Sequence, residues 1–243
     1  MPRFKITIQY DGTKFFGWQI QPSKRTVQDE LEKVISRFSD GEKIKVFGAG
    51  RTDTGVHALS QVAHFDLNTD LDTCNLIKAL NAHLSEDILV ESLDVVPADF
   101  HARYSAQIRC YRYQCYTGNN VLFRNQSWIT GQLDQSILQS VAETVVGEHD
   151  FLSFCKFRID MKSTVCKIYE SVWKKQDKML IYYVSGNRFL HHMVRYLTGT
   201  MVEISRGKCT IETFLSLLNN PEKNVQIFKA PPQGLILYKV DYA

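Results

Sequence analysis

Apolar and polar residues alternate from Phe4 to Tyr10 at the start of the chain. A spacing of two is the pattern of a half-buried β-strand. Over 27–38 the apolar residues instead recur at helical spacing, and Thr26 stands just before them as a candidate cap. The chain is therefore predicted to open with a strand, a loop and a helix.

The same patterns predict four more elements in the first half of the chain. Strands are expected at 43–47, 62–67 and 88–96, and a helix is expected to begin at Asp72 or Thr73. The resulting order, β-α-β-β-α-β, is that of the ferredoxin-like split βαβ unit. This unit is a mainly antiparallel sheet with two helices on one face.

The second half repeats this order of elements without repeating the sequence. We expect strands at 108–116, 165–174, 179–184 and 234–241, and helices at 134–146, 189–205 and 211–218. The predicted fold class is α+β, with two ferredoxin-like halves whose sheets are mainly antiparallel. The predicted domains are an N-terminal domain at 1–104 and a C-terminal domain at 105–243, which together form a central catalytic cleft.

Composition excludes some classes of protein. The hydrophobic content is 44%, ample for a core, and the formal net charge is only +3. No apolar run approaches the roughly 18 residues that cross a membrane, so no membrane partner is expected. The six cysteines form no CxxC pair, and the start of the chain shows no secretory signal. We expect reduced thiols in a cytoplasmic protein.

The segment 48–58 combines three glycines with Arg51, Asp53 and His57 between two predicted strands. Glycines disfavour a regular element and let another chain approach closely. One interpretation is that Asp53 is a nucleophile or general base, kept ionised by a nearby cation. The other is that Asp53 caps its own turn, with Arg51 as a surface partner.

Basic residues lie among aromatic ones in several other segments. Phe16 and Trp18 look like exposed aromatics in the polar loop at 13–25. The other residues of this kind are Phe100, His101, Arg103, Tyr104, Arg109, Tyr111, Arg112, Tyr113, Arg188, His191, His192 and Arg195. Such a mixture suits a polyanion with flat bases, because arginine pairs with phosphate and bases stack on aromatic rings.

Each of these residues also has a purely structural interpretation. Tyr111 and Tyr113 share one face of a predicted strand, and both can be plain sheet residues. Arg188 and Arg195 can belong to a solvated helix face. His191 and His192 would point about 100° apart on a helix, so we expect no metal there. Neither a metal nor any other cofactor is expected.

Seven motifs in this order give the chain a close resemblance to the tRNA pseudouridine synthases of the TruA family. They are YDGTKFFGWQIQP at 10–22, GRTDTGVHA at 50–58, FHAR at 100–103, YRY at 111–113, HDFLSF at 149–154, GNRFLHHMVR at 186–195 and APPQGL at 230–235. Any one of them is weak evidence, but together they span nearly the whole chain.

The resemblance implies the pseudouridine synthase fold and an isomerase that converts uridine to pseudouridine in tRNA. In this family the substrate is the anticodon stem-loop, at tRNA positions 38, 39 and 40. The resemblance also implies a homodimer in which one tRNA contacts both subunits. No cofactor is implied.

The resemblance also implies roles for individual residues. Asp53 would be the nucleophile, Arg51 would assist it, and Tyr111 would stack on the uracil. Binding of substrate would fall to Tyr111, Arg195, Arg103, His57 and Arg188. Three first steps stay open for Asp53: attack at C1′, attack at C6, or removal of a sugar proton.

Two other classes of function account for part of the sequence. A non-catalytic RNA-binding protein with paired RRM-like sheets would explain the basic and aromatic strands. It would not explain Asp53 in a glycine-rich loop facing them, because an anion there repels phosphate. The RNP1 pattern of such proteins is also missing from the sequence. A metal- or aspartate-dependent hydrolase would need more carboxylates or histidines than His57 near Asp53.

Overall fold

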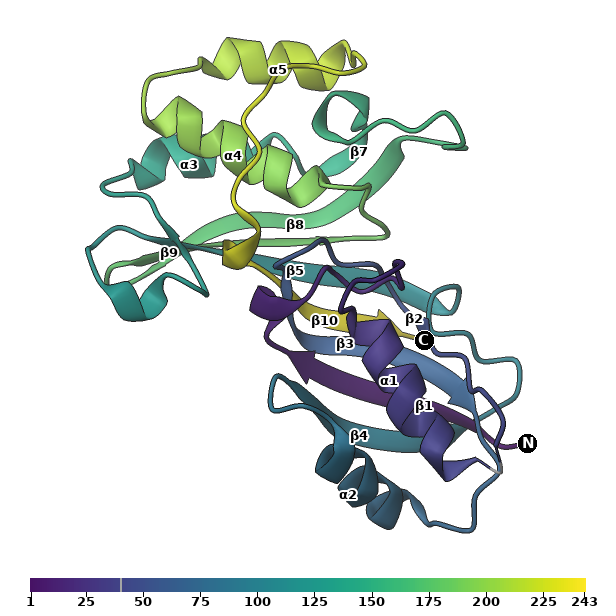
Figure 1. Ribbon diagram of the computed structural model, residues 1–243. Helices are drawn as coiled ribbons and strands as arrows, with labels where there is room; N and C mark the ends of the chain where they lie inside the picture. Colours follow the sequence, from purple (N-terminus) through teal and green to yellow (C-terminus); the bar gives the residue numbers. More distant parts are fainter. Residues whose placement is uncertain (40) are drawn as a thin grey trace. The chain divides into compact units, whose positions relative to one another are not determined.

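The computed structural model describes residues 1–39 and 41–243, and its contacts divide the chain into two compact units. Unit 1 comprises 1–107 and 237–243, and unit 2 comprises 108–236. Each unit combines a mostly antiparallel sheet with helices (Figure 1). The predicted α+β class with mainly antiparallel strands is therefore confirmed. None of the helices in the described residues is long and apolar enough to cross a membrane.

The sheet of unit 1 has the strand order β4-β1-β3, followed by β10, and β1 pairs antiparallel with both of its neighbours. In Figure 1, α1 and α2 cover one face of this sheet. The elements are β1 (Arg3–Tyr10), α1 (Val27–Ile35), β2 (Phe47–Gly48), β3 (His57–Asp66), α2 (Thr73–His83), β4 (Ile88–Val96) and most of β10 (Leu235–Tyr242). Short 3-10 helices lie at Gly12–Lys14 and Ser36–Phe38.

The predicted strand at 43–47 is wrong for most of its length, because only Phe47 belongs to β2. Ile44 and Val46 are buried, as the alternation predicts. Their backbone N–H groups, however, donate to Ser36 Oγ at 2.9 Å and to Glu32 Oε1 at 3.1 Å. Side chains at α1 and the turn after it thus take the hydrogen bonds that a neighbouring strand would have made.

In unit 2 the strand order is β5-β9-β8-β7, with antiparallel pairs throughout and a short parallel strand, β6, beside β5. The helix α3 packs on β8 and α4, and Figure 1 shows α3 and α4 on one face of this sheet. The elements are β5 (Ala106–Tyr116), β6 (Trp128–Ile129), α3 (Gln135–Glu143), β7 (Gly147–Asp150), β8 (Val165–Gln176), β9 (Met179–Gly186), α4 (Met193–Ser205) and α5 (Ile211–Asn219). Three 3-10 helices lie at Val121–Phe123, Leu152–Phe154 and Pro232–Gly234.

The helix expected at 189–205 begins four residues later, at Met193. The reason is local: His192 has a φ of +67°, in the left-handed region that a right-handed helix excludes. The apolar residue Leu190 therefore reaches the core from an irregular segment, and Phe189 before it is half-buried. The sequence patterns also did not predict the short strands β6 and β7.

Candidate active site

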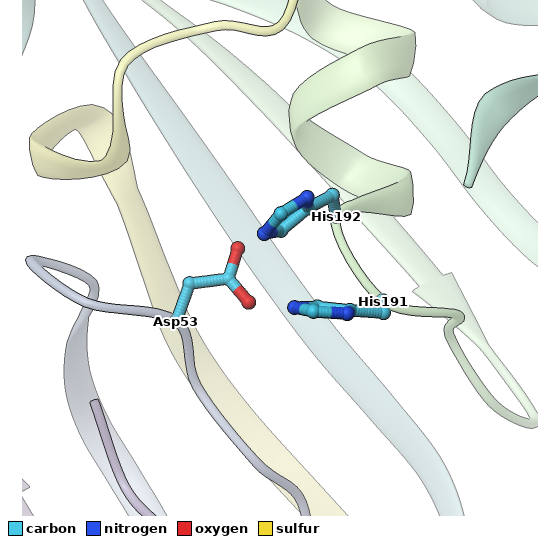
Figure 2. A group of neighbouring side chains, drawn as sticks. All are labelled: Asp53, His191 and His192. Atoms are coloured by element: carbon cyan, nitrogen blue, oxygen red, sulfur yellow. The ribbon is translucent and has the colours of Figure 1, made fainter. Parts of the chain in front are cut away.

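The loop that carries Asp53 joins β2 to β3 in unit 1 and is closed by a tight turn. The backbone N–H of Val56 donates to the carbonyl oxygen of Asp53 at 3.1 Å, and Gly55 has a φ of +77°. Arg51 is exposed and Asp53 is half-buried. The Asp53 carboxylate extends away from the loop backbone (Figure 2). A hydrogen bond between backbone groups therefore closes this turn.

The loop that follows β1 holds the Asp53 loop in place through backbone contacts. The N–H of Trp18 donates to the carbonyl of Thr52 at 3.1 Å, and the N–H of Gly55 donates to the carbonyl of Phe15 at 3.2 Å. Gly17 has a φ of +86°, and a Cβ at this position would lie 2.6 Å from the Thr52 oxygen. Glycine is therefore required at this contact.

Two further contacts bury the base of the Asp53 loop. Tyr10 Oη and Thr52 Oγ1 form a buried hydrogen bond at 2.8 Å. The indole of Trp18 packs so closely on Gly48 that a Cβ there would lie 2.6 Å from the ring. Trp18 is only 2% exposed, so its predicted exposure is wrong, whereas Phe16 is 41% exposed, as expected.

His57 is the first residue of β3 and is buried. Its Nδ1 accepts the backbone N–H of Gly12 at 3.0 Å and lies 3.1 Å from Asp11 Oδ1. His57 therefore ties the start of β3 to the loop after β1, beside the Asp53 turn.

Arg103 lies on the segment that follows β4, and its side chain is exposed. The guanidinium carbon is 5.8 Å from the ring centroid of Tyr104. This places a cation beside an exposed aromatic ring, within the same unit as the Asp53 loop.

Unit 2 carries the other three predicted site residues. Tyr111 on β5 is buried and meets Phe189 edge-on, with centroids 5.1 Å apart. The exposed Arg188 donates to the carbonyl of Ser163 at 3.2 Å. Arg195 on α4 is buried, and its Nε–H donates to the carbonyl of Ala230 at 2.8 Å. A solvated helix face is therefore wrong for Arg195.

The two tyrosines of the YRY motif differ in their surroundings. Tyr113 is fully buried, and its hydroxyl donates to the carbonyl of Pro231 at 2.8 Å. Burial raises the pKa of Tyr113 well above its usual value. Tyr113 is thus a core residue of unit 2, as the structural interpretation has it.

His191 and His192 lie directly before α4, with ring centroids 3.9 Å apart (Figure 2). They are not on a helix, so the expected divergence of about 100° does not apply. The backbone N–H of Lys156 donates to the carbonyl of His191 at 2.9 Å, and Lys229 Nζ is 3.4 Å from His192 Nδ1.

The sequence motifs marked the chemical side chains but not the residues that position them. Gly12, Gly17 and Trp18 lie in the YDGTKFFGWQIQP motif, and all three contact residues at 48–57. The signal was present in the two glycines of that motif, because each marks a place where another backbone comes close.

Comparisons with known proteins agree along the whole chain. The sequence model of the tRNA pseudouridine synthase family matches residues 6–105 and 141–243. The tRNA pseudouridine synthase A of Geobacillus sp. (strain WCH70) is 40% identical over 243 residues, which cover 99% of this chain and 98% of the relative. The protein of the same name from Dictyoglomus turgidum is 42% identical over 247 residues, with complete coverage of both chains. From this full-length similarity we conclude that the chain belongs to the tRNA pseudouridine synthase family.

Proposed function

We propose that this chain isomerises uridine to pseudouridine in the anticodon stem-loop of tRNA, with Asp53 as the nucleophile. Full-length similarity to tRNA pseudouridine synthases carries the reaction class, because the match extends over both units. The chain is accordingly an isomerase that acts on uridine in tRNA. The choice of the anticodon stem-loop rests on the family resemblance.

The reaction breaks the N1–C1′ bond of uridine and forms a C5–C1′ bond. The hydrogen at C5 leaves as a proton and N1 gains one, so no oxidant or reductant is consumed. A carboxylate can form a temporary bond to the ribose or to the uracil, or stabilise the charge that develops when the two separate. The uracil can then rejoin the ribose through C5. Asp53 is suited to this task because hydrogen bonds on both sides of its loop fix the backbone.

The base must leave its stack before this chemistry, which costs a few kcal/mol. We propose that Arg51, exposed two residues before Asp53, enters the gap and offsets part of that cost. Tyr111 is proposed to stack on the uracil. Arg103, Arg188, Arg195 and His57 are proposed as further substrate contacts.

The proposal includes a cytoplasmic, homodimeric enzyme. Burial raises the pKa of Cys155 to about 11 and that of Cys166 to about 12, which keeps both groups as thiols at neutral pH. Buried thiols of this kind suit a reducing compartment. The dimer rests on the family resemblance.

Tritium release from tRNA that carries uridine labelled at C5 tests the proposal. Wild-type protein should release tritium, because the C5 hydrogen is lost in every turnover. The Asp53→Asn variant should bind tRNA but release tritium slower by on the order of a thousandfold or more. Asp70→Asn is the matched control, since Asp70 is an exposed aspartate on another loop of the same unit.

Two outcomes would contradict the proposal in different ways. Full activity of Asp53→Asn would show that Asp53 is not the nucleophile, while the assignment of the chain as an isomerase would stand. Tight binding without release from any tRNA would favour the non-catalytic RNA-binding protein.

A further inference from the structure

Four aromatic rings contact one another in a row in unit 1, outside the Asp53 loop; Phe47 and His64 are stacked, and His64 meets His101 edge-on. Phe47 lies parallel to His64 at 5.1 Å, His64 meets His101 at 4.6 Å, and His101 meets Tyr104 at 4.3 Å, all measured between ring centroids. We call these four residues the aromatic stack. His64 is buried at its base, whereas Phe47 is 46% exposed and Tyr104 is 77% exposed.

Backbone hydrogen bonds hold the upper part of the stack in one arrangement. Nδ1 of His101 accepts the N–H groups of Arg103 and Tyr104 at 3.1 and 3.4 Å. The N–H of Ser105 donates to the carbonyl of His101 at 2.9 Å, and Ser105 Oγ accepts the N–H of His101 at 3.0 Å. The turn at 101–105 therefore presents Tyr104 on a fixed support.

The lower part is anchored to the sheet. His64 Nδ1 accepts the N–H of Ala102 at 3.1 Å, which ties the segment after β4 to β3. Burial, with the imidazole of His101 and the guanidinium of Arg3, lowers the pKa of His64 to about 4. Burial also lowers the pKa of His101. Both rings are consequently neutral at neutral pH and stack as uncharged aromatics.

Cations accompany both exposed rings. Residues 43–47 alternate between exposed and buried side chains, which places Lys43 and Lys45 on the same side of the segment as Phe47. The Arg103 guanidinium lies beside Tyr104. The nearby carboxylate of Asp66 is paired with Arg3 at 2.8 Å.

We propose that the aromatic stack is an RNA-contact site, where an unpaired base of the tRNA stacks on Tyr104 or Phe47 while Arg103 and Lys45 bind its phosphates. Aromatic rings beside cations are the usual elements of single-strand RNA binding. A second copy of this chain would instead bring identical cations against one another at a symmetric interface. The inference rests on the proposed function in taking tRNA as the ligand.

Measuring the affinity for tRNA at fixed salt tests the site with the full chain. Tyr104→Ala should raise Kd on the order of tenfold through the lost stacking, while Tyr104→Phe keeps Kd within roughly twofold. The slope of log Kd against log salt should stay unchanged in Tyr104→Ala. In Lys45→Gln it should become shallower by about 0.7, as for the loss of one phosphate contact to a single strand.

Tyr169→Ala is the matched control. Tyr169 is an exposed tyrosine in unit 2, with Lys167 Nζ 5.9 Å from its ring centroid. Its loss should leave Kd unchanged. An equal loss of affinity in Tyr169→Ala and Tyr104→Ala would overturn the proposal, because any exposed tyrosine would then serve.

Tritium release separates failure of this site from failure of the proposed function. If wild-type protein releases tritium and Tyr104→Ala binds tRNA as tightly as wild type, the RNA-contact site is overturned and the enzyme stands. If Tyr104→Ala leaves Kd for tRNA unchanged and changes only the oligomeric state of the protein in solution, the stack is an interface between copies. If wild-type protein neither binds tRNA nor releases tritium, the proposed function is overturned, and the contact site with it.

Discussion

His64 shows what tertiary surroundings do to one side chain. Its place in a strand is predictable, since it lies in the apolar run from Val62 to Leu67. Its neighbours are not, because the segment after β4 folds back to hydrogen-bond its ring. An ordinary histidine titrates near pH 6.5, whereas this one stays neutral down to about pH 4.

Replacing His64 with asparagine should remove part of the acid sensitivity of the fold. Below about pH 6.5 the unfolded chain binds a proton at His64, while the folded chain does not until about pH 4. The unfolded state therefore binds more protons, and stability falls as the pH falls through this window. Wild-type protein should lose on the order of 3 kcal/mol more than His64→Asn between these pH values.

Urea unfolding at a series of pH values checks this expectation. Asparagine can still accept the Ala102 N–H, so the variant is expected to fold. His83→Asn controls for the loss of an exposed imidazole on α2. If the free energy of unfolding depends on pH in the same way in wild type and His64→Asn, His64 takes up its proton equally well in the folded and unfolded states, and the expectation is wrong.

At the scale of elements, the loop after β1 is the support of the Asp53 loop. Its far end is fixed by Arg25, which pairs with Glu30 on α1 and with Asp87 at 2.7 Å just before β4. Burial raises the pKa of Asp87, but the hydrogen bonds from Arg25 and Ser85 outweigh it and leave the pKa lowered. The support is thus tied to two other elements of unit 1.

Gly17→Ala should disturb the Asp53 loop more than an ordinary loop substitution does. The new Cβ would lie 2.6 Å from the Thr52 oxygen and 3.1 Å from the Asp53 carbonyl carbon. These backbone atoms must move, and a displacement of about 1 Å at a reacting group costs on the order of a hundredfold in rate. We therefore expect a large fall in kcat for tritium release, with a smaller change in tRNA affinity.

Gly131→Ala is the matched control for that experiment. Gly131 also has a positive φ, +71°, but nothing lies within 4 Å of a Cβ at this position. Both variants carry the backbone strain, and only Gly17→Ala carries the clash. Equal kcat values for the two variants would mean that the contact does not position Asp53.

At the scale of the whole molecule, the chain presents an apolar surface that suits the proposed homodimer. The 3-10 helix Val121–Phe123 exposes three consecutive apolar side chains, and Leu122 is 80% exposed. Contiguous exposed apolar residues mark interaction surfaces. The division into domains at 1–104 and 105–243 stays a prediction.

Sedimentation equilibrium should give twice the chain mass of 28.0 kDa for wild-type protein. Leu122→Asp should shift the protein toward the single-chain mass, because a carboxylate at an apolar interface loses its hydration. The variant is expected to fold, since this side chain is exposed in the chain itself. A wild-type mass of one chain would contradict the dimer, and an unchanged mass of Leu122→Asp would place the interface elsewhere.

Local pattern by itself determined the type of most elements and the identity of the central loop. The strand at 88–96 was predicted to the residue, and Asp72 does cap α2 by accepting the N–H of Asn75. Both depend on neighbours in sequence, which is what periodicity and capping report. The motif at 50–58 likewise placed Asp53 on a loop between strands.

Only the tertiary structure decided what those elements touch. Trp18 is buried against Gly48, and the N–H of Val46 donates to Glu32. The helix α4 begins only after His192, whose backbone is left-handed. The aromatic stack joins β2, β3 and the segment after β4, which are far apart in sequence. Side-chain spacing along an element reports which face is buried but not which distant residue covers it, because that choice is made by packing between elements.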